Sequence, residues 1–302
     1  MAWVSEKVWW QFLPRCWNKQ LTTVLASGVV FWYNARNSIS MPLSMKPLSL
    51  LLAVTAFAHT ALAEITETPV EYKSAGATCE GIHVVDSTKT GKLPSVLIVH
   101  QWTGVSENEK MRARMLAEQG YNVFVADIYG KGVRPPGPPL SAKEASKYKK
   151  DRALYRERLN DALAQLVGEK ETDTAKVVAI GYCFGGTGVL ELARSGAAVK
   201  GVVSFHGGLD SPAPEDAKNI KGEVLALHGA DDPNVPAADV KAFEEEMAGA
   251  NVKYELVKYP GAVHAFTQKS AGNDPSKGVA YNAEADKKSW IAMMEFFGRV
   301  LK

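Results

Sequence analysis

A single cysteine stands at an abrupt change of pattern in the segment VVAIGYCFGGTGVLELA, residues 177–193. An apolar β-forming run ends at Gly181, and a helical pattern begins just after Cys183. This is the G-x-nucleophile-x-G spacing of a nucleophile elbow, with cysteine in the place of serine. The pattern predicts that Cys183, made more acidic by a helix N-terminus, attacks a carbonyl carbon while the Phe184 N–H faces the oxyanion. The alternative is a glycine-rich turn with an incidental buried cysteine.

Two further side chains follow in the chain order that such an elbow requires, first an acid and then a histidine. Asp232 comes after the strand-like run EVLALHG, and His264 comes after VKYELVKYP. The sequence therefore predicts a triad in which Asp232 orients His264 and His264 takes the proton from Cys183. Asp232 is the preferred acid of an adjacent pair, and the alternative for Asp231 is that it caps the turn.

The remaining histidines are interpreted as structural. His228 ends a core strand, and His83 lies in an early strand. His100 and His206 also lie at strand ends, where each can line the pocket without acting in catalysis. A metal site built from histidines is the alternative, but no HExxH motif or other tight ligand spacing supports it. We therefore expect neither a metal nor another cofactor.

The elements that must position these residues alternate between strand and helix. Continuous apolar runs predict buried strands, and amphipathic stretches predict helices. The expected strands are 70–73, 81–85, 96–100, 122–127, 176–181, 199–206, 223–229 and 252–260, and the expected helices are 107–119, 142–167, 186–195, 237–249 and 284–301. Ser141 and Glu144 fit a capping box for the second helix. This alternation predicts an α/β fold with a mostly parallel central sheet and helices on both faces.

Composition and the N-terminal region bound the domain organisation. The chain has 302 residues, 46% of them hydrophobic, and its formal net charge of +2 argues against a nucleic-acid partner. Residues 45–63 have the charged start, apolar run and small-residue end of a secretory signal peptide, although a buried helix or membrane anchor is the alternative. Residues 1–44 are interpreted as an unstructured or mis-assigned extension. We expect one domain over 64–302, periplasmic or secreted and not stably inserted in a membrane.

Two cysteines lie within residues 64–302, Cys79 and Cys183. They could pair in an oxidising compartment. Cys79, however, lies in the apparent strand ATCEGIHVVD, and we interpret it as a small buried residue.

Residues 70–300 resemble the dienelactone hydrolase family of α/β-hydrolases. The matching motifs are GYCFGG at 181–186, D-x-x-V-P at 232–236, G-x-x-H-x-F at 261–266 and G-Y-x-V-x-x-x-D at 120–127. The resemblance implies the α/β-hydrolase fold and hydrolysis of ester or lactone bonds in a small carbonyl substrate. It also implies the triad Cys183, Asp232 and His264, with Trp102 in HQWTG supplying the second N–H of the oxyanion hole.

Two positions depart from the founding enzymes of that family. Those enzymes carry a glutamate where this chain has Gln101, and that carboxylate takes part in switching the cysteine to thiolate as substrate binds. They also carry an arginine that holds the substrate carboxylate, where this chain has Gln268. Activation is therefore expected to rest on His264 alone. We place Gln101, His206 and Gln268 in the predicted substrate pocket.

The Gly/Pro-rich loop 129–140 and the helix expected after it are predicted to form a wall or lid over the site. Lys131, Arg134 and Lys150 there favour an anionic substrate, unless they form only a solvated surface. Two other functions stay open: a non-catalytic exported binding protein on the same fold, and a thiol-redox role of Cys183. The absence of a nearby resolving cysteine weakens the second. The sequence leaves the oligomeric state open.

Overall fold

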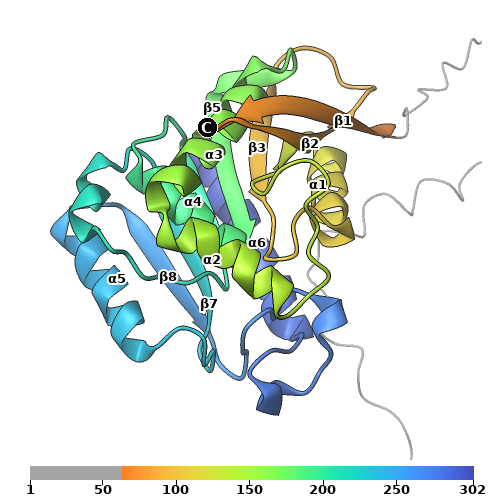
Figure 1. Ribbon diagram of the computed structural model, residues 1–302. Helices are drawn as coiled ribbons and strands as arrows, with labels where there is room; N and C mark the ends of the chain where they lie inside the picture. The colour runs from red at the N-terminus through yellow and green to blue at the C-terminus, as the bar shows by residue number, and fades with distance from the viewer. Residues whose placement is uncertain (1–62) are drawn as a thin grey trace, which may run out of the picture. The chain divides into compact units, whose positions relative to one another are not determined.

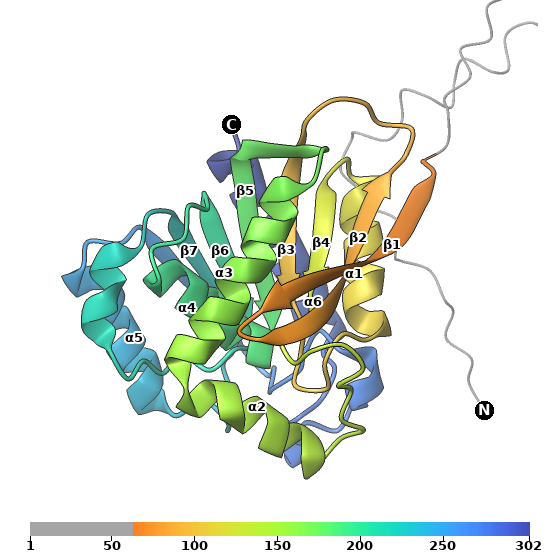
Figure 2. The ribbon, with the colours of Figure 1, turned by 45° about the horizontal axis from the view of Figure 1, so that its top comes forward.

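The computed structural model describes residues 63–302, which form one mixed sheet covered by helices (Figures 1 and 2). The strands are β1 (Ile65–Ser74), β2 (Ala77–Asp86), β3 (Leu93–Val99), β4 (Asn122–Ala126), β5 (Thr172–Tyr182), β6 (Gly201–Phe205), β7 (Glu223–Gly229) and β8 (Tyr254–Tyr259). The helices are α1 (Glu107–Glu118), α2 (Leu140–Lys150), α3 (Arg152–Gly168), α4 (Phe184–Arg194), α5 (Ala237–Gly249) and α6 (Ala283–Val300). Three short 3-10 helices are η1 (Pro214–Asn219), η2 (Lys269–Ala271) and η3 (Pro275–Lys277).

The sheet has the strand order β1-β2-β4-β3-β5-β6-β7-β8. Strands β1 and β2 form an antiparallel hairpin, and β2 pairs antiparallel with β4, whereas β4 to β8 pair in parallel through β3. The order reverses between β3 and β5, so the loops that leave these two strands diverge. Such a switch point is where an open parallel sheet forms a crevice for ligands. The predicted α/β fold with a mostly parallel sheet is confirmed.

Each face of the sheet has its own hydrophobic core. Along β3, Leu97 and Val99 point to the core shared with α3, α4 and α5, while Val96 and Ile98 point to the core shared with α1 and α6. Figure 2 shows these two helix layers on opposite sides of the sheet. This alternation is what a strand buried on both faces requires, and it explains the unbroken apolar runs in the sequence.

The expected helix 142–167 is in fact two helices, α2 and α3, separated at Asp151. The Asp151 side chain caps α3 by accepting a hydrogen bond from the Leu154 amide at 2.9 Å. The predicted capping box at Ser141 is wrong, because the Ser141 hydroxyl lies within α2, bonded to the Gly137 amide and the Pro135 carbonyl.

A capping box does form at the start of α1. There the Ser106 side chain accepts from the helix backbone, and the Glu109 carboxylate accepts from the Ser106 amide at 2.9 Å. The opening strands are also longer than expected, because the β1–β2 hairpin pairs along its whole length. Edge pairing of this kind stabilises polar stretches that carry no apolar signal.

The segments predicted to be an N-terminal extension and a signal peptide lie outside the described residues. Among residues 63–302, no helix is both long and apolar enough to cross a membrane. Cys79 is fully buried as predicted, and both it and Cys183 are free thiols, so the disulfide alternative is wrong for this structure.

Candidate active site

The turn between β5 and α4 holds Cys183 in a strained conformation. Its φ of 55° and ψ of −113° place it in a region that L-residues rarely adopt. A Cβ on Gly181 would lie 2.0 Å from the Gly185 carbonyl oxygen, and one on Gly185 would lie 2.1 Å from the Val99 carbonyl oxygen. Both positions therefore require glycine, and their lack of side chains lets α4 begin directly against the ends of β5 and β3.

The side chains of Cys183, His264 and Asp232 form a continuous line of contacts. His264 Nε2 lies 3.1 Å from Cys183 Sγ, and His264 Nδ1 lies 2.8 Å from Asp232 Oδ2. The structure thus brings together three residues that leave β5, β7 and β8 at one edge of the sheet. The neighbouring Asp231 accepts a hydrogen bond from the Gly261 amide at 2.9 Å, so its carboxylate holds the adjacent turn.

Backbone contacts fix the position of His264. Its amide donates to the Gly278 carbonyl at 3.2 Å, and its carbonyl accepts from the Ala280 amide at 3.0 Å. Asp232 Oδ1 accepts from the Asn234 amide at 2.8 Å, which leaves Oδ2 directed at the imidazole. The backbone contacts of His264 and the Asp232 carboxylate therefore fix the imidazole before any substrate binds.

Burial and charge together favour a thiolate–imidazolium pair. Burial by itself raises the pKa of Cys183, but the His264 ring, the Lys149 ammonium and the Phe184 amide outweigh it and lower this pKa below its ordinary value of 9.0. Burial likewise disfavours charged His264, but the Cys183 sulfur and the Asp232 carboxylate raise the pKa of His264 to about 10. Both shifts favour the state in which His264 carries the proton and the Cys183 sulfur is negatively charged.

The amides of Phe184 and Trp102 were predicted to form the oxyanion hole, and the structure describes their hydrogen bonds. The Phe184 amide hydrogen bonds to the Cys183 sulfur. Trp102 follows the end of β3, two residues after His100, whose carbonyl oxygen would lie 2.7 Å from a Cβ built on Gly185. The carbonyl of Trp102 accepts from the Tyr129 hydroxyl at 3.0 Å. Within residues 63–302 no carbonyl or side chain accepts a hydrogen bond from the Trp102 amide. This N–H is thus free to bind an oxyanion, and its place in the oxyanion hole stays a prediction.

The three residues predicted for the substrate pocket have different surroundings. His206 is buried and donates to or accepts from Thr267 Oγ1 at 2.8 Å, and its ring packs edge-on against His264 with centroids 5.3 Å apart. Burial holds the pKa of His206 well below 6.5, so its ring is neutral beside His264. Gln101 instead donates to Glu109 at 3.2 Å, and Gln268 donates to Ser270 at 2.9 Å.

Gln268 also borders a separate cleft of about 430 Å³ against α1, lined by Arg112 and Tyr281 among others. Gln101 and Gln268 therefore have partners outside the triad, and their contact with substrate stays a prediction. His100 bonds the Gln101 carbonyl at 2.6 Å and accepts from the Ile128 amide at 3.1 Å, which fits the structural role expected for it.

The sequence analysis missed the cation that acts on the thiolate. Lys131 is occupied by ion pairs with Glu71 and Glu80, and Arg134 pairs with Asp127 at 3.3 Å. Lys149, near the end of α2, is instead the lysine whose charge lowers the pKa of Cys183. Its ammonium lies 3.5 Å from a Cβ built on Gly208, in the loop after β6. No local pattern distinguishes it from the other lysines of α2.

Comparison with known proteins gives a consistent family. The model of the dienelactone hydrolase family matches residues 81–301. A protein of Synechocystis that carries the name carboxymethylenebutenolidase is 27% identical over 238 residues, covering 73% of this chain and 92% of its own.

Two solved structures are also similar. The protein named m3DLH is 34% identical with a TM-score of 0.76, covering 79% of this chain and 99% of its own. A dienelactone hydrolase-like promiscuous phosphotriesterase from metagenomic libraries is 37% identical with a TM-score of 0.74 and the same coverage. The chain therefore belongs to the dienelactone hydrolase family and is a hydrolase with the α/β-hydrolase fold.

Proposed function

We propose that the protein cleaves ester or lactone bonds of small carbonyl substrates by nucleophilic catalysis at Cys183. The observation that carries this proposal is the line of contacts from the sulfur through His264 to the Asp232 carboxylate, 3.1 Å and 2.8 Å long. The strained backbone at Cys183 supports it, because such strain persists where function maintains it.

The mechanism follows from the charges of the resting site. The Cys183 thiolate adds to the carbonyl carbon, and the amides of Phe184 and Trp102 bind the resulting oxyanion. The tetrahedral intermediate collapses by breaking the ester C–O bond, and the imidazolium of His264 gives its proton to the departing alkoxide. Neutral His264 then takes a proton from water, and the hydroxide attacks the thioester. Collapse of this second intermediate releases the acid and restores the thiolate.

This charge distribution also accounts for Gln101, which cannot accept a proton as the family's glutamate does. Because His264 and Lys149 already lower the pKa of Cys183, thiolate formation depends less on a further base when substrate binds. The same reasoning suggests a substrate preference, since a negative group on the substrate would meet the Lys149 ammonium near the thiolate. We therefore propose that anionic esters and lactones bind better than neutral ones of the same size.

A second activity is supported by the 37% identity to a promiscuous phosphotriesterase. A thiolate flanked by two N–H donors can attack phosphorus as well as carbon, because both reactions place a negative oxygen in the same hole. We propose phosphotriester hydrolysis as a side activity of the same site, measurable with paraoxon.

The proposal is tested with a panel of p-nitrophenyl esters and lactones, assayed with wild type, Cys183→Ala and Cys79→Ala. We expect Cys183→Ala to lose activity and keep its circular dichroism spectrum, whereas Cys79→Ala, which removes the other buried thiol, stays active. Full activity in Cys183→Ala would refute the proposed nucleophile. No hydrolysis of any member by wild type would favour the binding-protein alternative, and a Cys183 mass increased by oxygen or a disulfide partner would favour the redox one.

We also propose that the protein works outside the cytoplasm, because residues 45–63 have the pattern of a cleavable signal. Cell fractionation followed by N-terminal sequencing tests this. We expect the exported form to begin at Glu64, and a cytoplasmic protein that retains residues 45–63 would contradict it.

A further inference from the structure

A second cluster of reactive side chains lies at the edge of the sheet opposite Cys183. His83 projects from β2, and Glu169 and Glu171 lie in the turn between α3 and β5, beside a cleft of about 810 Å³. One ligand-type atom from each residue lies within 4.8 Å of the other two. We propose that these three side chains bind a divalent transition-metal ion of the Zn²⁺ class.

A chain of hydrogen bonds fixes the tautomer of His83. The Asn122 amide nitrogen donates to Thr172 Oγ1 at 2.8 Å, and that hydroxyl donates to the Leu166 carbonyl at 2.6 Å. The Asn122 amide oxygen therefore faces His83 Nε2, 2.5 Å away, and Nε2 must be the protonated nitrogen. With Nε2 engaged in this way, Nδ1 is the ring nitrogen left to bind a ligand in the cleft. A metal-binding histidine typically has this arrangement, in which the other ring nitrogen donates to an oxygen acceptor.

A hydrogen bond also orients the carboxylate of Glu169. Its Oε1 accepts from the Gln165 side chain at 2.8 Å, and its Oε2 lies 3.9 Å from His83 Nδ1. A metal ion between Nδ1 and the carboxylate oxygen would attract both, and a proton on Nδ1 is the competing way to stabilise this contact. Ligands of one tetrahedral Zn²⁺ are about 3.3 Å apart, so a small rotation of Glu169 completes the pair.

The third ligand, Glu171, has one oxygen with no partner. Its Oε1 lies 3.4 Å from the Lys170 ammonium, which is exposed. Its Oε2 is shielded from solvent and accepts no hydrogen bond from any of residues 63–302. A buried carboxylate oxygen without a donor is costly, and a bound cation removes that cost.

The donor set identifies the kind of metal. One imidazole nitrogen with two carboxylate oxygens suits Zn²⁺ and similar first-row ions, with water as a fourth ligand. Bound there, the ion would fasten the β1–β2 hairpin to the turn before β5, far from the triad. Lys89 and Lys92 also border the cleft, and the competing interpretation is that an ammonium group from one of them neutralises the carboxylates.

The test measures Zn²⁺ binding in a Cys183→Ala background, because the active-site thiolate and His264 would also bind Zn²⁺. Full-length protein is stripped with chelator, dialysed against Zn²⁺ and analysed for metal content, and its affinity is measured by competition with a chromophoric indicator. We expect one equivalent of Zn²⁺ and a Tm rise of about 5–10 °C at saturating metal.

Adding His83→Gln or Glu169→Gln to this background should weaken binding at least about tenfold. Adding Glu118→Gln, which neutralises an exposed carboxylate at the end of α1, should leave it unchanged. Two separate ligand variants keep the test valid if one of them fails to fold. Equal affinity in all four proteins, or no retained Zn²⁺ in the Cys183→Ala protein, would overturn the proposal.

Discussion

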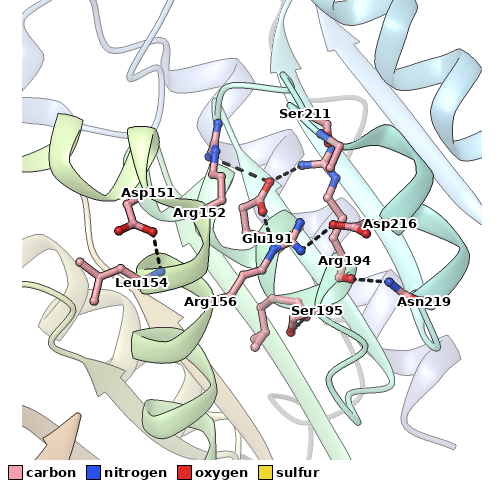
Figure 3. A network of polar contacts seen from close by, with 12 residues as sticks. Asp151, Arg152, Leu154, Arg156, Glu191, Arg194, Ser195, Ser211, Asp216 and Asn219 are labelled. Carbon is pink, nitrogen blue, oxygen red and sulfur yellow. Dashed lines mark hydrogen bonds and ion pairs between the residues drawn. The ribbon is translucent and has the colours of Figure 1, made fainter. Parts of the chain in front are cut away.

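Helix α4 has buried charge at both ends, and the two ends are built differently. Its N-terminus carries Cys183 with the His264–Asp232 pair, and its C-terminal half carries Glu191 and Arg194 within a network of ions (Figure 3). At the first end one member of the cluster, Cys183, remains partly exposed and strained. At the second end the two side chains on α4 are completely shielded from solvent.

In the network each charged group of α4 has partners from several elements. Arg194 makes two parallel bonds to Glu246 of α5, at 2.7 and 2.8 Å, and a third to Glu191 at 3.0 Å. Glu191 also accepts from Arg156 of α3 at 2.8 Å, and Arg156 reaches Asp216 of η1 at 2.6 Å. The network therefore joins three helices and η1 behind the elbow.

The difference between the two ends shows that buried charge by itself does not indicate catalysis. The network pairs its ions with fixed neighbours, so none is available to react. In the triad, the contacts run from the Asp232 carboxylate through His264 to the partly exposed Cys183 sulfur, which remains available to react. Loss of a partner should therefore reduce stability at one end and turnover at the other.

The largest expected effect is on turnover. Asp232→Asn removes the charge that orients His264 and stabilises its imidazolium, and it should lower kcat about 10⁴-fold with little change in stability. The matched variant Asp231→Asn loses only the bond to the Gly261 amide and should keep most of the activity. Steady-state kinetics of both variants on one p-nitrophenyl ester make the comparison. Similar losses in the two would remove the distinction between the adjacent aspartates.

The next effect is on stability at the other end of α4. Arg194→Met leaves Glu246 buried without its partner and should lower the free energy of unfolding by about 3–5 kcal/mol. Adding Glu246→Met should restore most of that loss, because the carboxylate left unpaired by Arg194→Met is then removed. Urea denaturation measures both, and kcat of the folded variants should stay near wild type. An Arg194→Met variant as stable as wild type would show that the network contributes little.

The pH dependence of alkylation separates a thiolate from a thiol at Cys183. The pKa of Cys183 is lowered and that of His264 is raised to about 10, so the thiolate–imidazolium pair should form at a lower pH than the thiolate of an isolated cysteine. The rate of iodoacetamide modification of the folded protein should therefore begin to rise at a lower pH than that of a free cysteine. In urea-unfolded protein the rate should instead rise around the free-cysteine pKa of about 8.5. Identical profiles would contradict the ion pair.

The smallest effect concerns Lys149. Lys149→Ala removes a positive charge near the sulfur and should raise the pKa of Cys183 and lower kcat/KM about two- to fivefold, with a larger loss on anionic esters. Lys150→Ala, one residue further along α2, serves as the matched control. Added salt should reduce the difference between them. Equal behaviour of the two variants would remove Lys149 from the site.

The elbow and the order of the triad could be predicted from the sequence because each depends on local spacing at a strand end. Gly181 and Gly185 are required by close backbone contacts, so their positions carry direct structural information. The break at Asp151 was missed, because one amphipathic pattern continues through both α2 and α3. The role of Lys149 depends on that break and on the loop after β6.

Clusters whose residues lie far apart in the chain also gave no signal in the sequence, because only the fold brings those residues together. His83 lies 86 residues before Glu169, and only the pairing of β2 and β4 and the packing of α3 bring them together. The ion pairs of Arg194 likewise join α4 to a helix 52 residues away. Charged residues in such clusters resemble an ordinary solvated surface until the fold is known.

The central claim is that Cys183 attacks the substrate carbonyl and carries the acyl group. Rapid acid quenching after mixing with p-nitrophenyl acetate, followed by peptide mass spectrometry, tests this most directly. We predict one acetyl group on the peptide that contains Cys183, formed within the first turnover and absent from Cys183→Ala. Steady hydrolysis with an unmodified Cys183 peptide, or an acetyl group on another residue that turns over at the catalytic rate, would contradict the account.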